Sequence, residues 1–328
     1  MKASRCSTRT AALISPSSVL QKRLSAAAAR TGLQTEAKKV EEKLKETHND
    51  SLSYGSDYHY LPVTSLESGD IHEVAPDVAG YTVQIVNICF IGKPEQAEWV
   101  LIDAGMPGSA DGIIAAAERR FGSGKGPQAI ILTHGHFDHV GAIIELIRHW
   151  RMPVYAHPSE IPYLTGRQSY PEPDASVDSG LVAKLSPLFP TRPIQLGEYI
   201  HPLPDDGTIP HLPEWKWLHT PGHTPGHISL FREQDHVLIA GDAFVTVKQE
   251  SLYKVFTQEK EISGPPKYLT TDWELAHQSV RKLEALKPRS VITGHGMPMK
   301  DDELAAQLTR LVDRFAEIAV PRQVKYVH

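Results

Sequence analysis

Short apolar runs alternate with amphipathic segments from residue 82 to residue 316 of this chain. A run such as Val237–Gly241 has the length and composition of a buried strand, whereas Ala110–Phe121 carries apolar residues at helical spacing. The pattern predicts strands at Thr82–Ile91, Trp99–Asp103, Ala129–Thr133, Pro153–Ala156, Trp215–Thr220, Ile228–Phe231, Val237–Gly241 and Ser290–Thr293. It predicts helices at Ala110–Phe121, Val140–Trp150, Glu274–Leu286 and Asp301–Ala316. This alternation indicates a layered α/β fold.

The chain is predicted to divide into a tail and one catalytic domain. Residues 57–328 are long enough to bury one sizeable core, so we expect a single domain there. Residues 1–56 are expected to be a disordered or targeting tail, because residues 1–35 contain six basic residues and no acidic residue. That composition suits either a mitochondrial transit peptide or a disordered basic tail. Within the domain, the proline-rich stretch 170–213 is predicted to be an irregular connection over the surface.

Charge and cysteine content narrow the class of partner. The net charge is −5, and removing the basic residues of segment 1–35 leaves −11, so nucleic acid is not an expected partner. No apolar stretch reaches the roughly 18 residues of a membrane-spanning helix. Cys6 and Cys89 provide no disulfide framework, which favours a reducing compartment.

We expect a cytoplasmic protein, or a mitochondrial matrix protein if residues 1–35 are a transit peptide. It should act on a small molecule, and a homodimer is left open.

Residues 134–139 read His-Gly-His-Phe-Asp-His directly after a predicted strand. Imidazole nitrogen and carboxylate oxygen are the ligands that zinc, iron, manganese or nickel accept without cysteine. His134 and His136 are two residues apart in an extended turn, so they can chelate one ion. Asp138 and His139 stand where a helix should begin, so they can turn toward a second ion beside the first.

Three further candidate ligands follow later strands and turns. His223 lies between two Pro-Gly turns and is the third candidate for the first ion. Asp242 directly follows the strand Val237–Gly241, where its carboxylate can bridge two cations. His295 comes just after the strand Ser290–Thr293 and would complete the second ion. The sequence therefore predicts a centre for two divalent metal ions on loops that follow strands.

These motifs, with Asp103 after an earlier strand, resemble the metallo-β-lactamase-fold hydrolase superfamily over roughly residues 57–320. The likeness is to single-domain members of the glyoxalase II or lactonase type. It implies a four-layer αββα sandwich of two halves that meet near Pro187–Leu196, with the metal site at the strand-end edge. It also implies the ligand sets given above, with Asp242 as the bridge. Asp103 and His227 are expected to hydrogen-bond the groups that hold the metals.

The expected reaction is hydrolysis by a metal-bridging hydroxide, because two cations lower the pKa of the water between them. One metal would polarise the scissile carbonyl and the other would stabilise the leaving group. Asp138 is the candidate catalytic residue, which would orient the nucleophile and shuttle its proton. We expect two Zn²⁺ ions, with iron, manganese, cobalt or nickel as alternatives, because availability often decides which metal is loaded.

Departures from known subfamilies narrow the expected substrate. Only residues 296–328 follow His295, which is too short for the helical extension with which glyoxalase II grips glutathione. Class B3 β-lactamases lack the bridging aspartate that Asp242 supplies, and the lactonase tyrosine three residues beyond it is Val245 here. We therefore expect a small ester or lactone, with a thioester of the glyoxalase II type as one alternative.

A persulfide dioxygenase is the other alternative. Such enzymes resemble this scaffold and use one iron, held by residues that match His134, His223 and Asp242. This chain instead retains every ligand for two metals, which favours the hydrolase. The substrate wall is expected in the segment Phe244–Tyr268, where the candidate pocket residues are Phe244, Val245, Tyr253, Phe256 and Tyr268.

Overall fold

The computed structural model describes residues 51–59, 61, 64–174, 186–247 and 260–321, which belong to one compact unit beginning at Ser51. Segment 51–56 lies within the predicted tail but packs on this unit, because Leu52 is buried and Ser53 pairs with Gln195. The segment that resembles a transit peptide lies outside the described residues. No helix in the described part of the chain has the length and apolar character needed to cross a membrane.

The first sheet contains seven strands in chain order. They are β1 (Ile71–Ala75), β2 (Val78–Val83), β3 (Val86–Ile91), β4 (Val100–Ile102), β5 (Ile130–Ile131), β6 (Val154–Ala156) and β7 (Ile200–Pro202). Neighbours are antiparallel from β1 to β4 and parallel from β4 to β7. The helices α2 (Ala110–Phe121) and α4 (Ile143–Trp150) pack on one face, because their apolar sides are buried against the strands.

The second sheet has the strand order β14-β13-β10-β9-β8. Its strands are β8 (Trp215–His219), β9 (Ile228–Arg232), β10 (Val237–Gly241), β13 (Ser290–Thr293) and β14 (Met299–Lys300). The helices α8 (Trp273–Ala285) and α9 (Asp301–Asp313) cover its outer face through residues such as Val280 and Leu308. A small separate ladder pairs β11 (Val245–Val247) with β12 (Lys260–Ser263).

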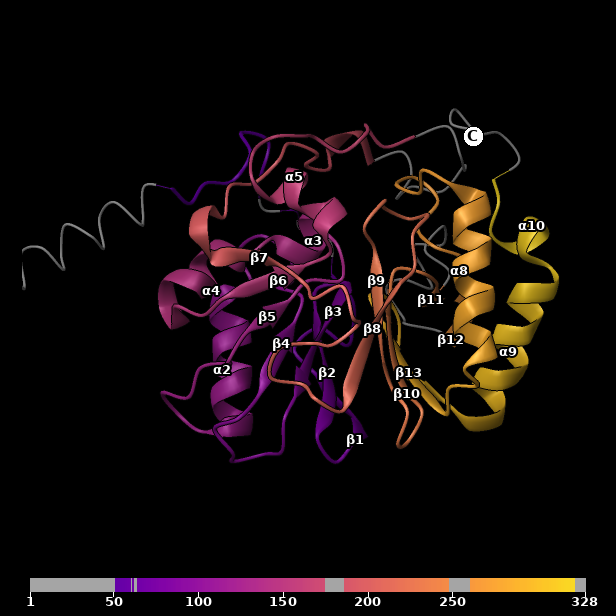
Figure 1. Cartoon of the computed structure of the whole chain (residues 1–328), viewed down its shortest axis with the longest axis horizontal. Coiled ribbons are helices and arrows are strands. Elements are labelled where there is room, and N and C mark those ends of the chain that lie inside the picture. The colour runs from indigo at the N-terminus through magenta and orange to yellow at the C-terminus, as the bar shows by residue number, and fades with distance from the viewer. Residues whose placement is uncertain (1–50, 60, 62–63, 175–185, 248–259, 322–328) are drawn as a thin grey trace, which may run out of the picture. The chain divides into compact units, whose positions relative to one another are not determined.

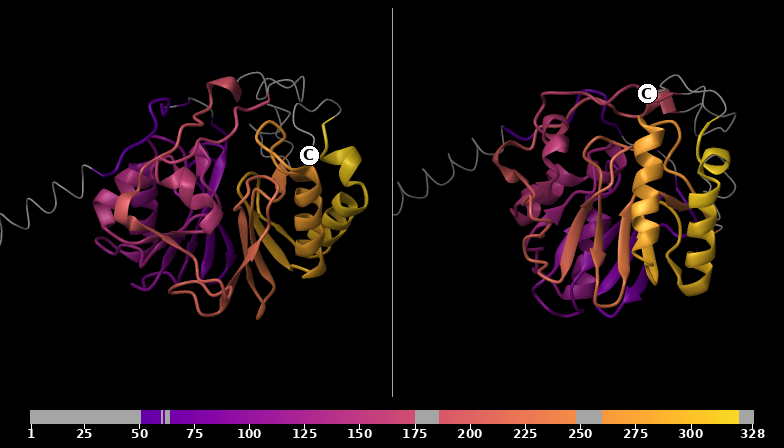
Figure 2. Two further views of the ribbon diagram at one scale, coloured as in Figure 1. Left: turned by 45° about the horizontal axis from the view of Figure 1, so that its top comes forward. Right: turned by 45° about the vertical axis from the view of Figure 1, so that its right-hand side comes forward.

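Apolar side chains fill the space between the two sheets. Cys89 and Ile102 from the first sheet and Trp215 and Ile239 from the second belong to this central core. Strands β2 and β3 are buried along their whole length, as expected where both faces of a sheet are covered. Figures 1 and 2 show the helices on the two outer faces, so the layers run helix, sheet, sheet, helix. The predicted four-layer αββα sandwich is confirmed.

Two of the predicted elements are divided in the structure. The predicted strand Thr82–Ile91 is wrong, because β2 and β3 form a hairpin around Gln84, whose φ is 57°. That left-handed value suits a tight two-residue turn, although no glycine, asparagine or aspartate marks it. The predicted helix Val140–Trp150 is split into α3 (Phe137–Val140) and α4. The backbone N–H groups of residues 141 and 142 bond to the carbonyls of residues 105 and 104 instead of continuing one helix.

Other differences lie at the edges of the fold. The predicted helix Asp301–Ala316 ends at Asp313 and is followed by the short α10 (Phe315–Ile318). The periodicity missed β1, β7, β11, β12 and β14, which have six residues or fewer and mostly lie at sheet edges. The described part of the proline-rich stretch 170–213 is irregular apart from short 3-10 turns and β7, in agreement with its prediction.

Candidate metal centre

The predicted ligands come together on loops at one edge of the two sheets. His134 follows β5, Asp242 follows β10 and His295 follows β13, while His223 lies in the turn between β8 and β9. The short helix α3, which carries Asp138 and His139, lies over this edge (Figure 1). All seven side chains are buried, and none is more than 6% exposed.

His134, His136 and His223 form one part of the site, here called the histidine half. Their candidate ligand atoms lie within 4.8 Å of one another. The Nδ1 atom of His136 is 3.0 Å from the Nε2 atom of His223, and the ring of His134 lies edge to face against both rings. Three imidazole nitrogens therefore converge on one point.

Asp138, His139 and His295 form the other part, here called the acidic half. Their candidate ligand atoms also lie within 4.8 Å of one another. The Oδ2 atom of Asp138 is 3.3 Å from Nε2 of His295 and 4.0 Å from Nε2 of His139. This half thus combines two imidazoles with a carboxylate.

Asp242 joins the two halves. Its Oδ2 atom is 3.5 Å from Nε2 of His223 in the histidine half. The same oxygen is 3.6 Å from Nε2 of His139 and 3.3 Å from Nε2 of His295 in the acidic half. Gly294 makes room for it, since a Cβ atom there would lie 2.1 Å from Oδ1 of Asp242. One carboxylate is therefore within reach of both candidate ions.

The donor set fits divalent cations. Within the described part of the chain, Nε2 of His134, Nε2 of His139, Oδ1 of Asp138 and Oδ1 of Asp242 are buried and have no hydrogen-bond partner. A buried polar atom without a partner costs free energy, and here several such atoms point toward common centres. Imidazole nitrogen with carboxylate oxygen suits zinc, iron, manganese, cobalt or nickel. The residues could hold two such ions.

The two halves differ in their electrostatics. Burial lowers the pKa of His136 to about 4, and burial with neighbouring imidazoles holds the pKa of His134 and His223 well below the ordinary value. In the acidic half, burial is outweighed by Asp242 and Asp138, which raise the pKa of His295 to about 10. Asp242 and Asp103 likewise hold the pKa of His139 well above its usual range. The histidine half is therefore neutral near pH 7, while the acidic half retains protons.

Hydrogen bonds behind the ligands fix the imidazole rings. The carboxylate of Asp103 accepts from Nδ1 of His139 at 2.8 Å and from the backbone N–H of Thr133 at 2.7 Å. Nδ1 of His295 donates to the carbonyl of Ile85 in the β2–β3 turn at 2.9 Å. Such contacts leave the opposite ring nitrogen free to bind a metal. The structure thus places Asp103 beside a candidate ligand, as predicted.

His227 contacts Asp242 through the backbone. Its Nε2 accepts a hydrogen bond from the N–H of Asp242 at 2.9 Å, and its Nδ1 lies 3.1 Å from the carbonyl of Thr220. Burial lowers the pKa of His227 to about 3, so the ring is neutral and suited to this pair of bonds. The ring therefore holds the loop that carries Asp242.

Sequence reasoning missed several residues around the site. Glu160 is fully buried and accepts hydrogen bonds from the loops on both sides of the histidine half. Thr270 lies 3.1 Å from Nδ1 of His223. Tyr58, from the segment before β1, has a pKa that is raised by burial, by Asp57 and by the nearby Asp138. None belongs to a motif, because each comes from a segment remote in sequence from the candidate ligand near which it lies.

The predicted substrate-pocket residues have different positions. Phe244 is fully buried in the core beneath α8 and α9, and Val245 is buried in β11, so neither side chain lines an open wall. The reason is that the chain re-enters the core directly after Asp242. Tyr268 is 9% exposed and packs on Phe189 with ring centroids 5.6 Å apart. The other two predicted residues, Tyr253 and Phe256, lie outside the described residues.

Comparisons with known proteins agree with this geometry. A family model described as the metallo-beta-lactamase superfamily matches residues 81–295. YflN of Bacillus subtilis, described as a probable metallo-hydrolase, is 52% identical over 260 residues, which cover 79% of this chain and 98% of YflN. The hydroxyacylglutathione hydrolase GloC of Haemophilus influenzae is 31% identical over 117 residues, or 35% of this chain and 49% of GloC.

A solved structure shows likeness in fold. A beta-lactamase domain protein from Burkholderia ambifaria matches with a TM-score of 0.51 at 20% identity, over 79% of this chain and 80% of that one. At this identity the likeness concerns the arrangement of layers and strands, not the substrate.

Proposed function

Because the chain belongs to the metallo-beta-lactamase superfamily, we propose that it is a metal-dependent hydrolase that opens a small ester or lactone. The main support is the complete set of seven buried His and Asp side chains whose ligand atoms converge on two adjacent centres. A complete set of metal-ligand atoms that are buried and have no hydrogen-bond partner is typical of a functional site. Packing of the core does not require such a set.

In this proposal one divalent cation binds to the histidine half and another to the acidic half, with Asp242 shared. When bound, the cations would lower the pKa of a water molecule so that it attacks near neutral pH, and they would polarise the carbonyl. The neutral imidazoles of the histidine half would bind the first cation without releasing protons. In the acidic half, the carboxylates of Asp138 and Asp242 would supply negative charge to the second cation.

Asp138 is proposed as the residue that orients the attacking water. Its Oδ2 atom faces His295, while Oδ1 has no partner among the described residues and can accept a hydrogen bond from the water. His139 and His295 lower the pKa of this carboxyl against the effect of burial, so Asp138 is ionised and able to accept a proton. The proton would then pass to the leaving alkoxide.

Aromatic side chains beside the ligand loops support an uncharged substrate with an apolar group. Phe137, within the ligand motif, has its ring centroid 5.0 Å from that of Phe189, which in turn contacts Tyr268. Tyr268 is two residues from Thr270, which contacts His223. Phe137 and Tyr268 are largely buried, so the partly exposed Phe189 between them is the ring of this group that could contact an acyl chain or lactone ring.

A thioester is the second candidate substrate, because the chain is similar over a limited region to the hydroxyacylglutathione hydrolase GloC. The same site chemistry would serve, since a thiolate leaves in place of an alkoxide.

A substrate panel tests the proposal. Purified protein would be assayed with lactones, aryl esters, thioesters and glutathione persulfide, before and after chelation and after metal is added back. We expect ester or lactone turnover that disappears with chelation and returns with Zn²⁺ or another divalent ion. Thioester turnover alone would favour the second candidate. Oxygen consumption with the persulfide, without any hydrolysis, would overturn both.

A further inference from the structure

Glu160 lies just after β6, outside every sequence motif, and its side chain is 0% exposed. Its carboxylate accepts four hydrogen bonds. Oε1 accepts from the hydroxyl of Thr224 at 2.7 Å and from the backbone N–H of Gly226 at 2.8 Å. Oε2 accepts from the backbone N–H of Gly135 at 3.0 Å and from the hydroxyl of Tyr170. A buried carboxylate is costly unless it is this fully hydrogen-bonded.

The four donors belong to segments around the histidine half. Gly135 separates His134 from His136, and Thr224 directly follows His223. Glu160 therefore connects the two loops that bring Nδ1 of His136 to within 3.0 Å of Nε2 of His223. We propose that Glu160 is a positioning residue, which fixes the separation of these loops and so sets the metal affinity of the histidine half. The inference rests on the proposed metal centre but not on the substrate.

The two glycines show how closely the loops approach this carboxylate. A Cβ atom at Gly226 would lie 2.8 Å from both Cγ and the backbone nitrogen of Glu160, which is closer than real side chains come. A Cβ atom at Gly135 would lie 2.6 Å from the hydroxyl of Tyr170. The ring of Tyr170 also packs on His136 with centroids 4.5 Å apart. The loops thus close on Glu160 as far as the backbone allows.

A carboxylate is required at this position because both of its oxygens accept backbone N–H groups. In Glu160→Gln, either orientation of the amide would place its NH₂ group against the N–H of Gly135 or of Gly226. One loop would then lose its backbone hydrogen bond to residue 160, while the shape and volume of the side chain stay the same. On the Gly135 side the N–H would keep only its 3.0 Å hydrogen bond to the hydroxyl of Tyr170. Side chains that orient metal ligands typically contribute about 10–100-fold to metal affinity. We expect a loss of that size, confined to the histidine half.

The test measures each half separately. In the His295→Ala background only the histidine half is intact, and in the His134→Ala background only the acidic half is intact. Zn²⁺ would be titrated into each metal-free protein against a competing chelator, with and without Glu160→Gln. We expect the dissociation constant to rise about 10–100-fold in the first background and less than about threefold in the second. Equal losses in both backgrounds, or no loss in the first, would overturn the inference.

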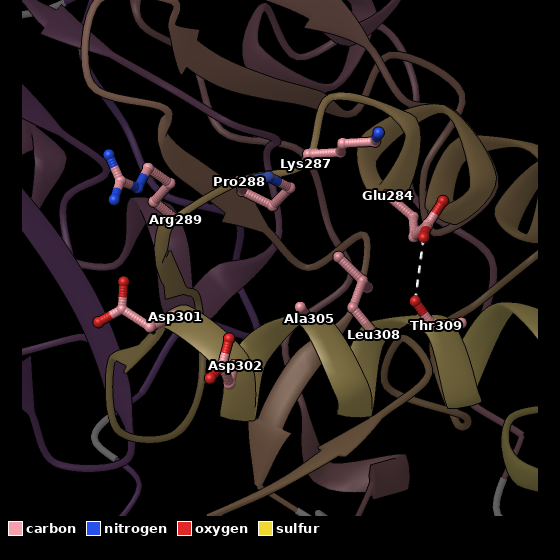
Figure 3. Close-up of a pocket in the computed structure, with 9 residues that line it drawn as sticks. All are labelled: Glu284, Lys287, Pro288, Arg289, Asp301, Asp302, Ala305, Leu308 and Thr309. Atoms are coloured by element: carbon pink, nitrogen blue, oxygen red, sulfur yellow. Dashed lines mark hydrogen bonds between the residues drawn. The ribbon is translucent and has the colours of Figure 1, made fainter.

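Two further variants separate positioning from general stability. Glu284→Gln is a matched control, because Glu284 accepts a hydrogen bond from Thr309 at 3.0 Å in a separate pocket between α8 and α9 (Figure 3). It should leave both affinities unchanged. If Glu160→Gln does not fold, Thr224→Val removes one donor and keeps the carboxylate. It should weaken the histidine half by up to about tenfold, as expected for one hydrogen bond, and an unchanged affinity would contradict the proposal.

The outcomes also distinguish this inference from the proposed function. If the unmodified chain binds no divalent ion, the proposed metal centre fails. If the unmodified chain binds two ions and Glu160→Gln binds both equally well, only the role of Glu160 fails.

Discussion

The two halves of the candidate metal centre are both buried and share one carboxylate, that of Asp242, but their imidazoles differ in protonation state when no metal is bound. The histidine half contains three imidazoles whose pKa values are lowered, so it is neutral at pH 7. The acidic half contains histidines whose pKa values are raised by Asp242, Asp138 and Asp103, so it holds protons that balance the carboxylates. A cation can enter the first half without displacing a proton, whereas in the second it must replace one.

The loss of Asp242, whose carboxylate is within reach of both halves, should affect both ions most directly. Asp242→Ala should release both ions and reduce turnover to background, because the negative charge that faces both centres is removed. Elemental analysis and the substrate panel would be measured on the same sample. A variant that keeps both metals and substantial turnover would show that Asp242 is not a bridge.

Single-ligand variants should separate the halves. His134→Ala should remove the ion from the histidine half, and His295→Ala should remove the ion from the acidic half, so each protein should bind one Zn²⁺ per chain. Each change should also lower turnover strongly, because hydrolysis is proposed to need both ions. If either variant still binds two ions, that residue is not a ligand and the division into halves is incorrect.

The pH dependence of metal affinity should differ between these same variants. The pKa of His295 is about 10 in the metal-free protein, so affinity at the acidic half should rise with pH up to that value, by up to about tenfold per pH unit for each proton released. The pKa of His136 is about 4, so affinity at the histidine half should be flat above about pH 5. Chelator competition at several pH values measures how steeply the Zn²⁺ affinity of each half changes with pH. Equal pH dependence in the two variants would show that the halves do not differ in protonation state.

The free energy of unfolding of the metal-free protein should depend on pH in a different direction for each half. The pKa of His136 is lowered by folding, so its contribution to the free energy of unfolding is present above the unfolded pKa of 6.5 and is lost as pH falls toward 4. His295 has a raised pKa, so its contribution is present below 6.5 and is lost as pH rises toward 10. The melting temperature should therefore peak near pH 6.5. Thermal unfolding after chelation checks this, and a plateau from pH 5 to 9 would argue against it.

Asp103→Asn is expected to lower metal affinity less than loss of a ligand does, and only in the acidic half. Both oxygens of the Asp103 carboxylate accept hydrogen bonds, from Thr133 and from His139. The NH₂ group of an asparagine at this position would therefore face one of these donors. Affinity at the acidic half should fall about 10–100-fold, with the histidine half unchanged. Thr270→Val, which removes the contact to Nδ1 of His223, is the matched change on the other side. Its effect should appear in the histidine half only.

The smallest expected effect is that of Tyr58→Phe. Its hydroxyl has no hydrogen bond to the candidate ligands among the described residues, so metal content should not change. The value of kcat/KM should stay within about tenfold of that of the unmodified chain, the value of one neutral hydrogen bond. Loss of metal, or a larger loss of turnover, would show that Tyr58 takes part in the site.

The candidate ligands could be identified from the sequence because each lies in a short motif that follows a strand. The fold could be predicted for the same reason, since long apolar runs such as Val237–Gly241 remain buried whatever surrounds them. Glu160 and Ile85 could not, because their roles arise from contacts between segments far apart in the chain. The substrate wall was misplaced at Phe244, because a large apolar residue after a ligand fits a core as well as a pocket.

We propose that this chain holds two divalent ions and uses them for hydrolysis. The most direct test is metal content per chain by elemental analysis, with lactone, ester and persulfide assays on the same preparation. Two ions per chain, with ester or lactone turnover that is lost on chelation, is the predicted result. One iron per chain, with oxygen consumption on persulfide and no hydrolysis, would contradict it.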